Sequence, residues 1–168
     1  MLPPWSRRLG ALVALLAAAP AFAQTAPPRY GVGFDVSAGA GGGNVVPDGP
    51  ALGLRGRVAL PVNADLSVAA SLGVSAHLFE GTSDAAVVLN PQTSLIVTVP
   101  GARTVRYYLG GFGVLLPLSG GGGGTVHGGV GWAFPLAATS LYVEVNPSLV
   151  VGEDAAAGLL SVRGGVIF

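Results

Sequence analysis

Apolar residues alternate with small or polar residues through most of this chain. A period of two is the spacing of a β-strand, because successive side chains of a strand point to opposite faces. Outside the first 23 residues, no apolar stripe with the 3.6-residue period of a helix is found. The pattern predicts eight strands, at residues 30–40, 51–61, 65–79, 87–99, 104–116, 125–135, 140–151 and 158–168.

The N-terminal segment differs from the rest. Arg7 and Arg8 precede an apolar run that is shorter than the ~20 residues a membrane-spanning helix needs, and an A-x-A motif ends at Ala23. We therefore predict a cleavable signal peptide over residues 1–23 and an exported protein. A short lead over residues 24–29 would connect it to the first strand.

Composition and connections narrow the fold class. Only 10% of the residues are charged, against about a quarter in typical soluble domains. Nucleic-acid binding needs basic patches, so this low charge argues against a nucleic-acid partner. There is no cysteine to form a disulfide. Longer and shorter connections alternate along the chain, as in an up-and-down barrel with its short turns and both termini at one end. We predict an all-β protein, an eight-stranded antiparallel transmembrane β-barrel over residues 30–168.

The direction of the apolar face decides between two kinds of barrel. A secreted calycin-like barrel, which binds a ligand, has its apolar residues inside, whereas a membrane barrel has them outside. Here the polar face consists mostly of Gly, Ser and Ala, which suit the narrow interior of eight strands. The aromatic residues near the short turns also favour a membrane, as an interfacial girdle. We assign to it Tyr30, Tyr107, Trp132, Phe134 and Phe168.

The last strand alternates apolar residues through Val162 and Val166 to Phe168. With "RYYLGGFGV" and "LYVEVNPSL", it resembles the small eight-stranded bacterial outer-membrane β-barrel proteins of the OmpA/OmpX type. The resemblance covers about residues 30–168. It implies an outer-membrane location, with outer-membrane lipids as partners. It also implies a C-terminal assembly signal at Val162, Val166 and Phe168 for the barrel-assembly machinery, with periplasmic chaperones acting during biogenesis. The even number of strands places both termini, and so the lead, at the periplasmic end. We expect a monomer.

Six charged residues in the strands are predicted to lie opposite the apolar face and to form a polar network in the lumen. They are Asp35, Arg55, Arg57, Arg106, Glu144 and Arg163. Buried charges need partners, since an unpaired one costs several kcal/mol. The network would fill the barrel, and the alternative is a narrow passage for protons or ions.

Chemistry-bearing residues are few. His77 and His127 are predicted to point inward, without enough further ligands for a metal. Ser75 and two acidic residues after His77 leave open a lipid A-modifying barrel enzyme, although an inward His77 argues against it. The glycine-rich runs lack the Lys-Ser/Thr of a phosphate-binding loop. We predict no catalytic residue, metal or cofactor, and a structural or surface-interaction role. The secreted calycin-like barrel is the main alternative.

Overall fold

The structure is a computed structural model. The residues that it describes are 26–40, 45–46, 49–77, 86–118 and 121–168. The predicted signal peptide and the first two residues of the lead lie outside this part of the chain. Among the described residues, no helix is long and apolar enough to cross a membrane.

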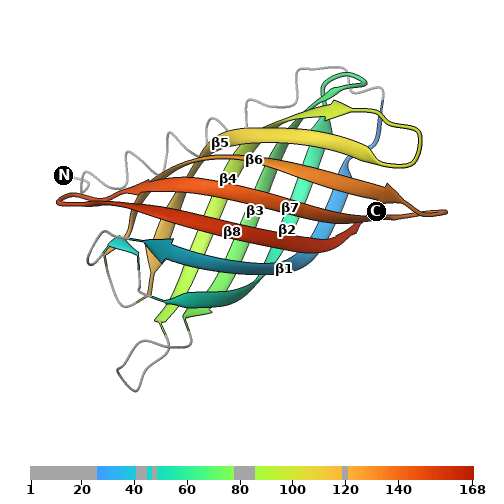
Figure 1. Cartoon of the computed structure of the whole chain (residues 1–168). Helices are drawn as coiled ribbons and strands as arrows, with labels where there is room; N and C mark the ends of the chain where they lie inside the picture. The colour runs from blue at the N-terminus through green and yellow to red at the C-terminus, as the bar shows by residue number, and fades with distance from the viewer. Residues whose placement is uncertain (1–25, 41–44, 47–48, 78–85, 119–120) are drawn as a thin grey trace, which may run out of the picture.

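Eight antiparallel strands form one closed barrel, in which each strand pairs with the next and the first pairs with the last. Figure 1 shows a single sheet closed into a barrel, with its strands tilted relative to the barrel axis. They are β1 (Arg29–Ala40), β2 (Pro50–Pro61), β3 (Leu66–His77), β4 (Ala86–Val99), β5 (Val105–Pro117), β6 (Gly123–Pro135), β7 (Ser140–Val151) and β8 (Ala156–Ile167). The predicted fold class is confirmed, and the predicted strand ends lie within two residues of the observed ones. The predicted end of the third strand, residues 78–79, lies outside the described residues.

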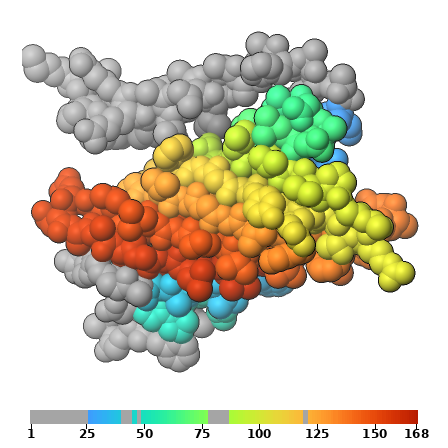
Figure 2. All heavy atoms as spheres, turned by 45° about the horizontal axis from the view of Figure 1, so that its top comes forward, coloured from blue at the N-terminus to red at the C-terminus, as the bar shows by residue number. Residues whose placement is uncertain are grey.

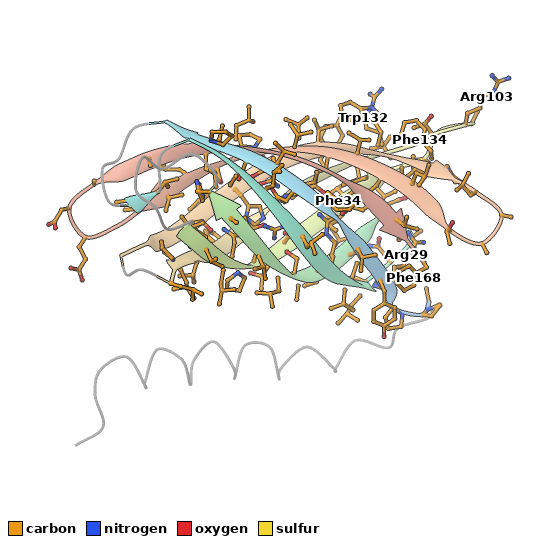
Figure 3. The ribbon with its side chains drawn as sticks, turned by 90° about the horizontal axis from the view of Figure 1, so that it is seen from below. Arg29, Phe34, Arg103, Trp132, Phe134 and Phe168 are labelled. Atoms are coloured by element: carbon orange, nitrogen blue, oxygen red, sulfur yellow. The ribbon has the colours of Figure 1, made fainter. Side chains whose placement is uncertain are left out.

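The two ends of the barrel differ. One end, here called the turn end, carries the turns at 62–65, 100–104 and 136–139 together with Phe168; the other is called the loop end. Asn63 shapes one of these turns, because its side-chain oxygen accepts hydrogen bonds from the backbone N–H groups of Asp65 (2.9 Å) and Leu66 (2.8 Å). Arg29, Arg103, Trp132, Phe134 and Phe168 lie toward one end in Figure 3, and Phe34 lies nearer the middle.

The outward face is apolar on all eight strands. Phe34, Leu54 and Phe112 are 71%, 61% and 67% exposed, and every other strand also carries exposed large apolar side chains. Figure 2 shows the face formed by β5 to β8 as a continuous surface between the projecting turns. Exposure of such an apolar face to water is unfavourable, whereas contact with lipid is favourable. The calycin-like alternative required the opposite arrangement of faces.

The lumen has three layers. At the loop end an apolar cluster contains Val45 and Val46 from the β1–β2 connection, packed against Val88, Leu115, Val150, Ala157 and Leu159. A polar layer follows in the middle. A second apolar cluster lies toward the turn end and contains Ala59, Ala69, Ile96, Tyr107, Leu109 and Ala133.

These apolar layers explain one wrong prediction. Tyr107 lies inside the barrel at 5% exposure, and Arg106 lies on the outward face, so the sequence-based assignment of both residues was inverted. In β5 both faces are apolar, with Leu109 and Leu115 inside and Phe112 outside, so alternation does not define the lipid side there. Arg106 is the second residue of β5, close to the turn end, where an outward charge costs little. Tyr108, rather than Tyr107, joins the outward aromatics at this end.

Candidate functional site

The middle layer of the lumen, here called the polar belt, is the candidate site. The antiparallel register brings its charges to one level, because Arg163 on β8 stands opposite both Asp35 on β1 and Glu144 on β7. Arg55 and Arg57 reach the same level from β2. All five point inward, and Glu144 is fully buried.

Four ion pairs connect the belt. Arg163 donates from Nε to Asp35 Oδ2 (3.0 Å) and from Nη1 to Glu144 Oε1 (2.8 Å). Arg55 Nε donates to the same Asp35 oxygen at 3.2 Å. Arg57 Nη2 donates to Glu144 Oε2 at 2.6 Å. Each carboxylate therefore bridges two guanidinium groups, which compensates for the loss of water around the buried charges.

Neutral side chains complete the hydrogen bonds of the arginines. Gln92 Oε1 on β4 accepts from Arg55 (3.1 Å) and from Arg163 (3.3 Å). Arg55 also donates to Asn90 Oδ1 at 3.2 Å and to Ser71 Oγ at 3.0 Å. The belt contains three arginines but only two carboxylates, those of Asp35 and Glu144. The amide oxygens of β4 therefore stabilise the excess positive charge. The sequence signal for them is a pair of amides at alternate positions of one strand, which the charge-based prediction did not use.

Two tyrosines close the belt on its turn-end side. Tyr107 OH donates to Glu144 Oε2 at 3.2 Å, and the ring of Tyr142 lies 5.7 Å from the Arg57 guanidinium carbon. Inward glycines make room for these rings. A Cβ on Gly131 would collide with the Tyr107 ring, and one on Gly165 would collide with Tyr142 and with the backbone of β1.

The adjacent glycines of β8 give a matched test of this packing. We expect Gly165→Ala to lower the free energy of unfolding by about 1–3 kcal/mol, because the new methyl group meets backbone atoms of Val32 and Gly33 that cannot move independently. Gly164→Ala is the control, since its Cβ points outward and meets only the Tyr142 carbonyl oxygen at 3.6 Å. Urea unfolding followed by the fluorescence of Trp132 measures both. Equal losses for the two variants would contradict the close packing of the lumen.

The belt leaves little free space. A cavity of about 20 Å³ lies beside Arg55, Arg163 and His77, which is room for about one water molecule. His77 and His127 are both buried, and His127 Nε2 lies 3.0 Å from Ser94 Oγ. Among the described residues, no group of three or more His, Cys, Asp or Glu could hold a metal ion. The arrangement can fill and seal a lumen.

The outward residues of the turn end form a second group. The Phe168 and Tyr30 rings stack with their centroids 6.3 Å apart, and their backbones exchange two hydrogen bonds of 2.8 Å each. Phe134 is exposed beside the half-buried Trp132. Val162 and Val166 also lie on the outward side of β8. The last residue is therefore held in the β1–β8 seam.

Solved structures of low sequence identity share this fold. No model of a protein family matches the chain, and no curated protein sequence matches it. Neisserial surface protein A (NspA) is similar with a TM-score of 0.66 and 10% identity, over 83% of this chain and 95% of that one. Ail, the attachment invasion locus protein of Yersinia pestis, gives 0.53 and 14%, over 84% and 97%. A designed transmembrane β-barrel gives 0.50 and 13%, over 86% and 98%.

The fold defined by these features is the closed eight-stranded antiparallel barrel with an apolar outside and a polar layer across the middle of its lumen. It is the fold of the small outer-membrane β-barrel proteins that the sequence resembles.

Proposed function

We propose that this chain is a monomeric outer-membrane protein with a structural or surface-contact role and a sealed lumen. The observation that carries the proposal is the apolar outward face of all eight strands, around a lumen whose middle layer is filled by paired charges. Such a surface is stable in lipid and would aggregate in water. The predicted signal peptide supports export, and the names of the surface protein NspA and the attachment protein Ail support a place at the cell surface.

The proposal also covers the assembly and the orientation of the protein in the membrane. The outward alternation of Val162, Val166 and Phe168 would serve as the assembly signal for the barrel-assembly machinery, after periplasmic chaperones have delivered the chain. The turn end, with its aromatic residues, would face the periplasm.

The proposal includes no enzymatic activity, because the buried histidines face the lumen and not the lipid, where a lipid A-modifying site would have to act.

Cell fractionation tests the membrane location. We expect the protein in the outer-membrane fraction, and we expect unheated samples to migrate on gels at a different position from boiled ones, because a folded barrel resists the detergent of the gel. A soluble product that migrates identically before and after boiling would overturn the proposal.

The same preparation tests the sealed lumen. Reconstituted into liposomes, the folded protein is expected to give no swelling in arabinose or raffinose, because the belt leaves space for about one water molecule. Empty liposomes set the baseline and a general porin sets the positive control. Swelling at the rate of the porin would contradict the sealed lumen while leaving the membrane location intact.

A further inference from the structure

A cavity that the proposed function does not use opens at the turn end of the barrel. Its volume is about 450 Å³, within the range of roughly 300–1,000 Å³ for small-molecule sites. Small and aliphatic side chains dominate its walls, among them Ala59, Ile96, Val105, Ala133 and Ile167. Ser67, Thr98, Thr139 and Ser140 add hydroxyl groups to this lining. Apolar walls with several polar groups are the kind of lining that binds small molecules with an apolar and a polar part.

The cavity is closed at its inner end. Arg57, Tyr107 and Tyr142 form its floor, and the two tyrosines are 5% and 4% exposed. Arg57 and Tyr107 are both hydrogen-bonded to Glu144 behind them. The cavity is therefore a dead end below the polar belt rather than the entrance of a channel.

The charges around the cavity are asymmetric. Arg29 is exposed at the rim, and no acidic side chain lies among the described residues that line the cavity. The buried carboxylate of Glu144 lies directly behind the floor. Arg57 adds a second positive charge at the floor, but the Glu144 carboxylate already compensates it. An anionic group is therefore placed best at the mouth beside Arg29, because burial at the inner end would remove its water.

We propose that this cavity binds a single-chain amphiphile with an anionic head group, such as a fatty acid. The alkyl chain would lie inside, against Ala59, Ile96 and Ala133, and the head would stay in water beside Arg29. Binding would be driven by the displacement of water that the apolar walls cannot hydrogen-bond. From the rim at Arg29 to Gly33, at the level of Tyr142, β1 runs roughly 13 Å at about 3.3 Å per residue, which suits a chain of medium length.

Methyl NMR of the folded protein in phosphatidylcholine nanodiscs tests the proposal, with sodium decanoate as the probe. We expect saturable shifts of the Ala59, Ile96 and Ala133 methyl signals. The Val88 and Val150 signals, from the apolar cluster at the loop end, should stay unchanged. Shifts confined to outward methyl groups such as Ala70 would show that decanoate only partitions into the lipid, and would overturn the proposal.

Filling the cavity gives the matched variants. Ala59→Leu is expected to weaken decanoate binding by at least about tenfold, because its side chain occupies the space of the ligand. Ala70→Leu, on the outward face of the neighbouring strand, is the control and should bind like the unmodified protein. If Ala59→Leu does not fold, Ala133→Leu fills the same cavity from β6. Unchanged binding in a folded filling variant would contradict the site.

The head group is tested separately. Arg29→Gln is expected to weaken decanoate binding roughly two- to fivefold, as for an exposed ion pair, and to leave the binding of the uncharged alcohol decanol unchanged. Equal affinity of the unmodified protein for decanoate and decanol would overturn the anionic assignment.

Discussion

Glu144→Ala is expected to lower the free energy of unfolding by about 3–5 kcal/mol, the usual cost of removing one partner from a buried ion pair. Glu144 accepts hydrogen bonds from Arg57, Arg163 and Tyr107 and is fully buried. Alanine would leave two guanidinium groups facing each other across an empty space. The resulting repulsion and exposure of polar atoms should open the barrel at this level.

Glu144→Gln separates the role of the charge from that of the shape. Glutamine keeps the volume and one oxygen acceptor, so we expect a smaller loss of roughly 1–3 kcal/mol. Glu153→Ala is the control, because Glu153 is exposed in the β7–β8 turn, and a surface change of this kind stays within about 0.5 kcal/mol. Urea unfolding and the temperature of the gel shift measure all three variants. Identical melting of the Ala variant, the Gln variant and the unmodified protein would show that the network does not stabilise the barrel.

The belt also shows which parts of the site a sequence can predict. Asp35, Glu144 and Arg163 lie on strands whose two faces differ clearly, so parity alone places them inside. On β7, for example, Leu141 and Val143 alternate with Tyr142 and Glu144. Closure of the barrel then makes β1 and β8 neighbours, which brings Arg163 to Asp35 although they are 128 residues apart.

The parts that could not be predicted share one physical cause. Parity rests on a contrast between the faces, and the lumen loses that contrast where it becomes apolar near both ends. Leu109 and Leu115 face inward on β5 while Phe112 faces outward. Alternation therefore could not decide which of Arg106 and Tyr107 points into the lumen. Packing of Val45 and Val46 into the loop end depends on the path of a connection, for which no periodic pattern exists.

Arginine in place of Phe34 is expected to lower the free energy of unfolding by about 2–4 kcal/mol, because a charge at mid-membrane on the lipid face loses its water. Phe34 is the sixth residue of the twelve in β1, and its side chain is 71% exposed on the outward face. The measurement is urea unfolding of the barrel in lipid vesicles, followed by the gel shift. A smaller yield of the heat-shifted form in cells should accompany the loss.

Leu118→Arg is the control. Comparison of the two variants tests how the cost of an outward arginine depends on its depth in the membrane. Leu118 is 68% exposed, almost as much as Phe34, but it follows β5 at the loop end, where an outward charge costs about 0–1 kcal/mol. The chain itself already has an outward arginine, Arg106, close to the opposite end of the same strand. If Phe34→Arg and Leu118→Arg lowered the free energy of unfolding by the same small amount, the apolar outward face would be in contact with water. The outer-membrane proposal would then fail together with the lipid argument on which it rests.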